Sequence, residues 1–138
     1  MDFSTEKYSK NPENISNIDP FPRFNHMKVL AFYDDGSAEG ELSITPDSLN
    51  PMGCVHGGCL CTLADAVAGW GAAASQKKTC VTVSTSLNYL RPALGSNEKI
   101  HCLATPRKLG KTLCVYEVSL TDDSGKEVVS GELTFFLS

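Results

Sequence analysis

The sequence lacks the features that mark several classes of protein. Its 138 residues hold twelve Lys and Arg against sixteen Asp and Glu, a formal net charge of −4. Proteins that bind duplex nucleic acid usually present a basic surface, so this charge balance disfavours that class. The first ten residues contain no apolar run of the kind that a secretory signal needs. We therefore expect a cytoplasmic protein with no nucleic-acid partner.

A membrane-spanning segment is also missing from the pattern. The longest weakly charged stretch, residues 48–76, is rich in Gly, Ala and Cys and carries Asp65 inside it. A carboxylate near the middle of a span costs about 3 kcal/mol on insertion scales, and small residues offset little of that cost. We expect no association with a membrane.

The six cysteines do not form a recognisable metal or disulfide pattern. The sequence has no C-x-x-C pair, and its 41% hydrophobic residues suffice for a core without disulfides. A zinc site built from Cys54, His56 and Cys59 would lack any known ligand spacing. We expect no metal and six reduced thiols.

The chain divides into an N-terminal lead-in, residues 1–27, and a single domain, residues 28–138. The lead-in is polar and carries three prolines, so the sequence predicts at best a short helix at Thr5–Lys10 followed by irregular chain. Three apolar side chains are expected to anchor the lead-in on the domain: Phe21, Phe24 and Met27.

The domain contains one long helix between two groups of strands. Residues 57–76 are apolar at nearly every helical angle, and their only charged side chain is Asp65, so this helix is predicted to be buried. Its interior Gly69 and Gly71 are expected to permit the close approach of another backbone. Period-two patterns separated by turn residues predict six strands: 28–33, 37–45, 81–89, 98–108, 112–120 and 127–137.

The order of these elements predicts the fold class. Consecutive strands with short turns form an antiparallel sheet, and one apolar helix is available to cover it. We expect an α+β fold in which a curved antiparallel sheet wraps around the central helix. Alternation in the strand 81–89 places Val81 and Val83 toward the helix and Thr82 away from it.

A motif before the helix resembles a known family. Residues Asn50–Gly58 have the sequence N-P-M-G-C-V-H-G-G, and Asp65 follows in the helix. The strand 81–89 runs into Tyr89-Leu90-Arg91-Pro92, and a later turn has the sequence Leu109-Gly110-Lys111. From about Val29 to Phe136 the chain resembles the hotdog-fold acyl-CoA thioesterases, in the PaaI-type branch of the 4-hydroxybenzoyl-CoA thioesterase superfamily. The resemblance implies a hotdog fold, hydrolysis of acyl-CoA without a cofactor, and dimers or dimers of dimers with shared sites.

The same residues make chemical sense for hydrolysis of a thioester. A helix N-terminus offers free N–H groups and a positive dipole end, and Gly57 and Gly58 let a carbonyl oxygen approach those amides as in an oxyanion hole. Asp65, a carboxylate in an apolar helix, suits a general base or a nucleophile. The alternative for Asp65 is a structural carboxylate that bonds a neighbouring loop.

The spacing of these groups predicts a second subunit. Gly57 and Asp65 are eight residues apart, which is ~12 Å along a helix. Reacting atoms must lie ~3–3.5 Å apart, so one thioester cannot reach both groups in one chain. If they act together, Asp65 comes from a partner whose helix runs antiparallel, as in a C₂ dimer.

The resemblance assigns further roles. It implies that Asn50 and His56 shape the loop and help to hold the thioester or a water molecule, although His56 could instead only bond a nearby backbone group. It also implies that the Thr82 hydroxyl assists the carboxylate, which conflicts with the alternation described above. Because the coenzyme A arm is anionic, it is expected near free amides and basic side chains, the alternative for each charge being an ordinary solvated turn charge; the candidates are Gly58, Arg91, Arg107, Lys108, Gly110, Lys111 and Thr112. Among these, the resemblance most favours the turn Arg107–Thr112.

Two other functions fit the same fold. One is a non-catalytic acyl-CoA-binding module, since a fold does not determine a function. The other is a hydratase or dehydratase, which is disfavoured because the helix carries no His after residue 56. The sequence leaves the acyl group open; its pocket is expected between the lead-in and the helix around Val67–Gly71.

Overall fold

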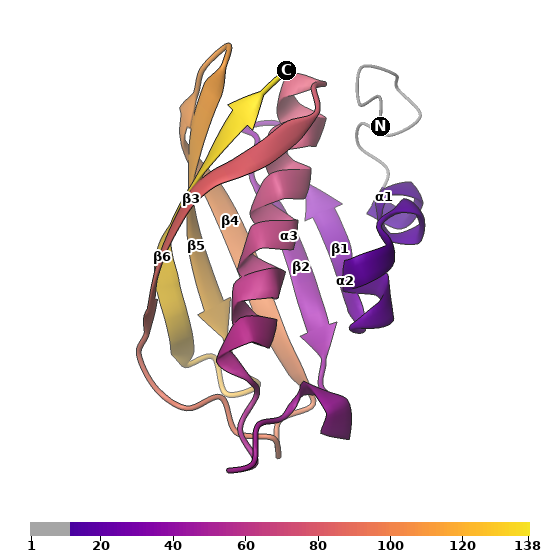
Figure 1. The fold of residues 1–138 in the computed structure, drawn as a ribbon, viewed down its shortest axis with the longest axis vertical. Helices are drawn as coiled ribbons and strands as arrows, with labels where there is room; N and C mark the ends of the chain where they lie inside the picture. Colours follow the sequence, from indigo (N-terminus) through magenta and orange to yellow (C-terminus); the bar gives the residue numbers. More distant parts are fainter. Residues whose placement is uncertain (1–11) are drawn as a thin grey trace.

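The computed structural model describes residues 12–138 (Figure 1). Two short helices come first, and a pair of strands, a 3₁₀ turn, one long helix and four more strands follow. In chain order the elements are α1 (Pro12–Ile18), α2 (Pro20–Phe24), β1 (Met27–Phe32), β2 (Ala38–Ser43), η1 (Pro46–Ser48), α3 (Gly57–Gln76), β3 (Cys80–Tyr89), β4 (Lys99–Leu109), β5 (Leu113–Thr121) and β6 (Glu127–Leu137). The predicted order of two strands, one long helix and four strands is confirmed. The helix predicted at Thr5–Lys10 lies outside the described residues.

The six strands form one antiparallel sheet in the order β1-β2-β4-β5-β6-β3. The sheet curves around α3, which lies against its inner face (Figure 1). Leu63 and Val67 of α3 are fully buried, as are Leu42, Tyr116 and Leu133 of the sheet. The predicted α+β fold with a central buried helix is therefore confirmed.

Two glycines let α3 approach the sheet closely. A Cβ atom on Gly40 of β2 would lie 2.5 Å from Cγ2 of Val67, and a Cβ atom on Gly71 would lie 3.3 Å from the carbonyl oxygen of Gly36. The prediction of close backbone approach is confirmed for Gly71. At Gly69 the corresponding neighbour is the ring of Phe135 at 3.6 Å, an ordinary contact with a side chain.

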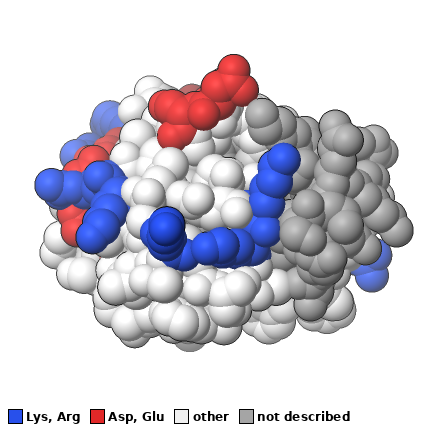
Figure 2. All heavy atoms as spheres, turned by 90° about the horizontal axis from the view of Figure 1, so that it is seen from above, with Lys and Arg blue, Asp and Glu red and all other residues white. Residues whose placement is uncertain are grey.

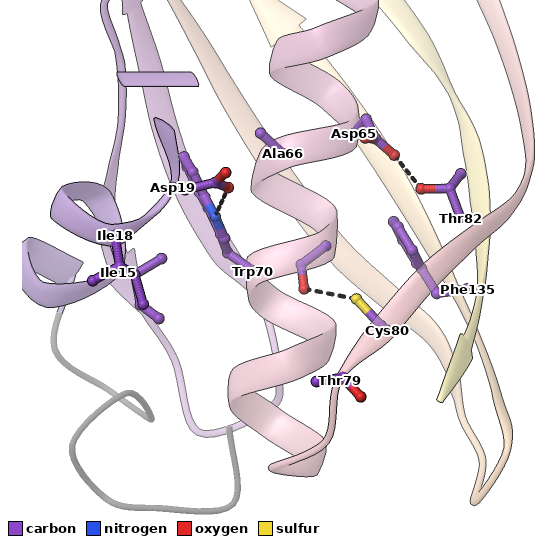
Figure 3. Close-up of a pocket in the computed structure, with 11 residues that line it drawn as sticks. Ile15, Ile18, Asp19, Asp65, Ala66, Trp70, Thr79, Cys80, Thr82 and Phe135 are labelled. Atoms are coloured by element: carbon purple, nitrogen blue, oxygen red, sulfur yellow. Dashed lines mark hydrogen bonds between the residues drawn. The ribbon is translucent and has the colours of Figure 1, made fainter. Parts of the chain in front are cut away.

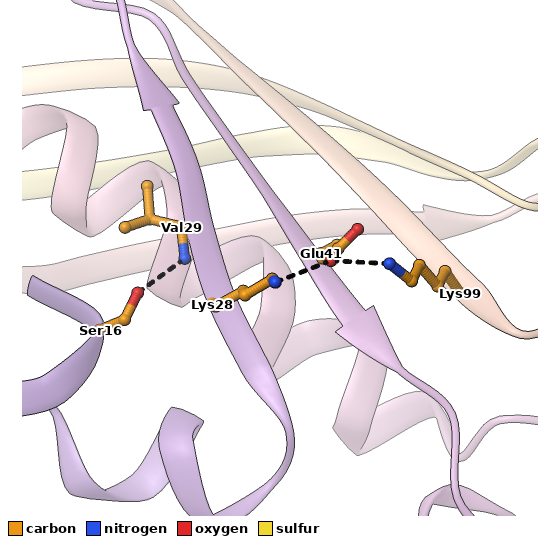
Figure 4. A network of polar contacts seen from close by, with 5 residues as sticks. All are labelled: Ser16, Lys28, Val29, Glu41 and Lys99. Atoms are coloured by element: carbon orange, nitrogen blue, oxygen red, sulfur yellow. Dashed lines mark hydrogen bonds and ion pairs between the residues drawn. The ribbon is translucent and has the colours of Figure 1, made fainter. Parts of the chain in front are cut away.

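The lead-in packs along strand β1. Ser16 Oγ accepts a hydrogen bond of 3.1 Å from the backbone N–H of Val29. Beside it, Glu41 of β2 lies between the ammonium groups of Lys28, at 3.6 Å, and Lys99, at 3.1 Å (Figure 4). The Ser16 bond satisfies a backbone donor of the edge strand β1 that would otherwise be unpaired.

The predicted anchors of the lead-in are partly wrong. Met27 is buried, but Phe21 and Phe24 are 64% and 81% exposed. The two rings are three positions apart on the single-turn helix α2 and so share one face. Pro22 is the buried residue of α2, and Ile15 of α1 is buried as well. These two side chains, and not the two phenylalanines, anchor the lead-in together with Met27.

Strand β3 departs from the predicted alternation. Its pairing with β6 shifts register between Thr82 and Ser84, so Val83 is an extra residue in the strand. Thr82 therefore shares the inner face with its partner Phe135, and Val81 and Val83 are 64% and 58% exposed. A bulge of this kind reverses the side-chain parity on one side of it.

Within residues 12–138, no helix is long and apolar enough to cross a membrane. All six cysteines are free thiols.

Candidate active site

Asp65 and Thr82 form the central polar pair of the site. Thr82 Oγ1 on β3 donates a hydrogen bond of 2.6 Å to Asp65 Oδ1 on α3 (Figure 3). The prediction that Thr82 points away from the helix is wrong, because the bulge at Val83 turns Thr82 inward. The implied pairing of hydroxyl and carboxylate is present, and Asp65 bonds a strand side chain and not a loop.

A cavity of about 360 Å³ adjoins this pair. Two small residues of α3, Ala66 and Gly69, line it. Its other lining residues come from the lead-in, the helix, the segment before β3, and strands β3 and β6: Ile15, Ile18, Asp19, Trp70, Thr79, Cys80 and Phe135. This cavity lies between the lead-in and α3, the region where the sequence predicts the acyl pocket; Gly69 and Trp70 line it, whereas Phe21, Phe24 and Met27 do not.

The thiol of Cys80 in this cavity is not a nucleophile. Burial, with smaller contributions from Cys114 and Asp65, raises the pKa of Cys80 to about 12. Its Sγ donates to the carbonyl oxygen of Gly69 at 3.4 Å. Because the thiolate is the reactive form of cysteine, Cys80 is inert near neutral pH.

The N-terminus of α3 carries the predicted amide donors, but only one of them is open. His56 is the N-cap residue, and its Nδ1 accepts a hydrogen bond of 3.0 Å from the N–H of Gly58. Among the described residues no acceptor lies on the N–H of Gly57, which the helix itself leaves unpaired. The backbone-capping alternative for His56 is what the structure shows.

Tyr89 is a residue of this region that the sequence analysis did not single out. Its hydroxyl donates to the carbonyl oxygen of Gly57 at 2.9 Å, and its ring lies beside the Gly57 Cα. Tyr89 therefore fixes the first residue of α3 relative to the end of β3. The only signal was its place in the motif Tyr89-Leu90-Arg91-Pro92.

Asn50 shapes the loop that leads into α3. Its Oδ1 accepts hydrogen bonds from the N–H groups of Met52, at 3.0 Å, and Cys54, at 3.1 Å. This part of the implied role agrees with the geometry. A second cavity, of about 370 Å³, lies beside this helix end and is lined by His56, Gly58 and other residues of the loop and lead-in.

One chain does not bring the two halves of the site together. The carboxylate half of the site, Asp65 and Thr82, lines the first cavity, and the amide half, His56 and Gly58, lines the second. The first cavity contains no residue of the amide half, and the second contains no residue of the carboxylate half. Gly57 and Asp65 lie on the same uninterrupted helix, ~12 Å apart along its axis. A thioester at one group is therefore out of reach of the other.

The residues predicted to contact coenzyme A fall at two ends of the molecule. Lys108, Lys111 and Thr112 lie in or beside the β4–β5 turn, and Lys78 Nζ donates to the carbonyl oxygen of Lys111 at 2.8 Å. Basic side chains gather at this end, where α3 ends (Figure 2). Arg91 follows β3 near the opposite end of α3, since Tyr89 contacts Gly57.

Two of these predicted contacts have other partners in the structure. Arg107 forms ion pairs with Glu117 at 3.1 Å and Glu132 at 2.7 Å. The N–H of Gly110 donates to the carbonyl oxygen of Leu113 at 2.9 Å, within the turn. The Gly110 amide is therefore not a free donor in this chain, and the charge of Arg107 is already paired at Nη1.

No metal centre accompanies these groups in the described part of the chain, residues 12–138, where no three His, Cys, Asp or Glu side chains could together hold an ion. The zinc alternative at Cys54, His56 and Cys59 has no geometric support.

The profile of the Thioesterase superfamily matches residues 52–129, which include the loop, α3, β3 and Asp65. The chain belongs to this superfamily. A curated relative of this thioesterase is 1,4-dihydroxy-2-naphthoyl-CoA thioesterase 2 of Arabidopsis thaliana, 32% identical over 122 residues, which cover 80% of this chain and 77% of the relative.

Solved structures agree with the thioesterase fold. A hypothetical thioesterase of Streptococcus pneumoniae, crystallised with coenzyme A, is 26% identical with a TM-score of 0.79, and the match covers 89% of this thioesterase and 94% of that chain. The PaaI protein of Escherichia coli, from the phenylacetic acid degradation operon, is 21% identical with a TM-score of 0.83, covering 91% and 89%. The resemblance to the hotdog-fold thioesterases is confirmed.

Proposed function

We propose that this thioesterase hydrolyses acyl-CoA thioesters with Asp65 as base or nucleophile. The observation that carries the proposal is the Asp65 carboxylate on the wall of a cavity, with one oxygen held by Thr82 at 2.6 Å. That bond orients the carboxylate and leaves its other oxygen for water or for the thioester carbon. The coenzyme A in the streptococcal relative supports the same substrate class.

The N–H of Gly57 supplies the complementary half of the chemistry. It would donate to the carbonyl oxygen of the thioester and stabilise the negative charge that develops there. With Asp65 as base, the carboxylate takes a proton from water as the water oxygen bonds to the carbonyl carbon, the carbon–sulfur bond breaks, and that proton passes to the leaving sulfur, which gives the free acid and the coenzyme A thiol. With Asp65 as nucleophile, its oxygen bonds to the carbonyl carbon and displaces the thiolate, and water then hydrolyses the acyl-Asp65 anhydride and supplies the proton for the thiol. His56 and Asn50 hold the loop that positions this amide.

The two halves meet if two chains form a C₂ dimer. Strand β3 lies at the edge of the sheet, and Val81, Val83 and Tyr89 on it are more than half exposed. Long exposed edge strands with apolar side chains are normally covered, and pairing with the β3 strand of a second copy would do so. Antiparallel α3 helices then place each Gly57 near the Asp65 of the partner subunit.

The same arrangement would gather the basic residues. Arg91 lies near the start of α3, and Lys108 and Lys111 lie near its end. In an antiparallel dimer Arg91 of one chain approaches the lysine-rich turn of the other. Both would then be available to the phosphates of one coenzyme A molecule.

Replacing Asp65 tests the proposal. Asp65→Asn keeps the shape of the side chain and an acceptor for Thr82 but removes the charge, so kcat on a panel of acyl-CoA substrates should fall about 10²–10⁴-fold. Hydrolysis is followed by chromatography, because partly exposed free thiols of the protein, such as Cys54, would react with a thiol dye. The control is Glu98→Gln, the same chemical change at an exposed side chain outside both cavities.

Each outcome has a definite meaning. A folded Asp65→Asn protein that keeps wild-type turnover would remove Asp65 from the mechanism. A wild-type protein that binds acyl-CoA but hydrolyses none would favour the non-catalytic binding module. Detection of a covalent acyl-enzyme in a single turnover would make Asp65 the nucleophile, and its absence would make Asp65 the base.

A further inference from the structure

The first turn of α3 is held by bonds of two kinds, local ones and one from the sheet. The turn starts with Gly57 and Gly58, and two glycines give it little conformational preference of its own. A local bond runs from the N–H of Leu60 to the carbonyl oxygen of His56, at 3.1 Å. The bond from the sheet is the one that the hydroxyl of Tyr89 donates to the carbonyl oxygen of Gly57 at 2.9 Å, from 32 positions along the chain.

The Tyr89 bond bears on the direction in which the N–H of Gly57 points. The peptide group after Gly57 is held on both sides, by Nδ1 of His56 on its N–H and by the Tyr89 hydroxyl on its carbonyl oxygen. Without the hydroxyl one side of this group is free, and a glycine offers little resistance to rotation. An oxyanion donor must lie within about 2.7–3.1 Å of the developing charge, so a small rotation of the turn weakens it.

Strand β3 holds the carboxylate half of the site as well. Thr82 on this strand donates to Asp65 at 2.6 Å, and both Thr82 and Tyr89 pair with buried residues of β6 and so share the inner face. Residues seven positions apart face opposite sides of a regular strand. The extra residue, Val83, is therefore what allows one strand to present both hydroxyls to α3.

We propose that Tyr89 is a positioning residue for the oxyanion amide, so that β3 sets the place of both halves of the chemistry. Tyr89 touches no reacting atom: its hydroxyl acts through Gly57, as the hydroxyl of Thr82 acts through Asp65. When two β3 strands pair in the C₂ dimer, Tyr89 of one chain approaches Thr82 of the partner subunit, and one site takes one of these hydroxyls from each chain. This inference rests on the proposed function and adds a residue to its active site.

Removal of the hydroxyl alone tests the proposal. Tyr89→Phe keeps the ring, which would lie 3.6 Å from a Cβ atom on Gly57, and removes only the donor. We expect kcat on the acyl-CoA panel to fall about tenfold, with KM changed less than about twofold, because the bond supports a donor to the transition state.

A second tyrosine provides the matched control. The hydroxyl of Tyr33 donates to Glu39, also at 2.9 Å, and Tyr33 is about half exposed, as Tyr89 is. Tyr33 lines neither of the two cavities of the site. Tyr33→Phe makes the same chemical change away from α3 and should keep the wild-type kcat and KM.

Two kinds of analogue separate the positioning of the amide from a general loosening of the site. In ketone analogues of benzoyl-CoA and hexanoyl-CoA, a CH₂ or a CF₂ group separates the carbonyl from the sulfur. The CH₂ ketone keeps a planar carbonyl like the substrate, whereas the CF₂ ketone adds water and becomes tetrahedral like the transition state. Calorimetry should show that the wild-type protein binds the CF₂ ketone of at least one acyl group about 10²-fold more tightly than the CH₂ ketone. In Tyr89→Phe the affinity for that CF₂ ketone should fall by about the same factor as kcat, and the affinity for the CH₂ ketone should change little.

The outcomes distinguish this proposal from the proposed function. Wild-type kcat in Tyr89→Phe, or an equal loss of affinity for both kinds of ketone, overturns the positioning role of Tyr89 and leaves hydrolysis intact. A preference for the CF₂ ketone that depends on Tyr89, without turnover of any thioester, supports the role of Tyr89 and overturns hydrolysis. Absence of turnover together with absence of any preference for the CF₂ ketone contradicts both.

Discussion

At the scale of single residues, the Thr82 hydroxyl is the group that orients Asp65. Thr82→Val has nearly the same shape but cannot donate, so the carboxylate loses its bond of 2.6 Å. A hydrogen bond to a charged group contributes about 1.5–3 kcal/mol, so kcat should fall about 10- to 100-fold. Steady-state kinetics should show little change in KM, because the shape of the cavity of about 360 Å³ beside Asp65 stays intact.

A conservative variant separates this positioning role from a structural one. Thr82→Ser keeps the hydroxyl and should restore most of kcat, whereas a role in packing alone would make Ser as harmful as Val. Equal kcat in wild type and Thr82→Val would show that the bond does not matter in the reaction.

Thr82 also shows where a strand pattern stops being informative. Beyond the bulge, Leu87 packs against the core as alternation along the strand requires, but the same alternation placed the exposed Val81 and Val83 beside the helix. The extra residue at Val83 leaves no trace in the sequence, because two valines suit an exposed interface as well as a core. Asp65 and the helix N-terminus were easier to predict, since each depends on neighbours within one helix.

At the scale of elements, two glycines of α3 should respond oppositely to alanine. A methyl group at Gly69 would contact Phe135 at 3.6 Å and enter the acyl cavity, whereas at Gly71 it would lie 3.1 Å from Ala38 Cβ. Gly69→Ala should stabilise the protein by up to about 1 kcal/mol through helix propensity and lower kcat/KM for aromatic acyl groups. Gly71→Ala should destabilise it, because the helix must move from the sheet.

Urea unfolding and a substrate panel measure both effects. Short acyl groups serve as the control, since they need less of the cavity and should be hydrolysed by Gly69→Ala at near the wild-type rate. A Gly69→Ala protein that is less stable than wild type would show that the backbone at Gly69 is closely packed after all.

These glycines illustrate what the element pattern could and could not predict. Length, apolar periodicity and turn residues were enough to predict the order of the strands and the long helix along the chain, and to predict that α3 is buried. The lead-in was harder to predict, because helices α1 and α2 have seven and five residues and depend on contacts with β1 and α3. Short helices gain most of their stability from such packing and little from propensity.

At the scale of the whole molecule, the spacing of Gly57 and Asp65 predicts that each site takes one group from each subunit. Gly57→Pro removes the amide donor at the first helical position, where proline is well tolerated. His56 already has φ −59° and ψ 136°, a conformation that suits the residue before proline. Asp65→Asn removes the other half of the site, and each variant alone should be nearly inactive.

Pairing the two inactive chains gives the decisive measurement. A heterodimer of Gly57→Pro and Asp65→Asn, isolated with a different tag on each chain, has one site with both wild-type groups and one site with neither. It should recover about half of the wild-type turnover per dimer. If Gly57 and Asp65 of the same chain worked together, every site would carry one lesion and the heterodimer would stay inactive. Val83→Lys is the assembly control: a charge on the exposed edge of β3 should yield a folded monomer by light scattering, and that monomer should be inactive although it retains Gly57, Asp65 and Thr82.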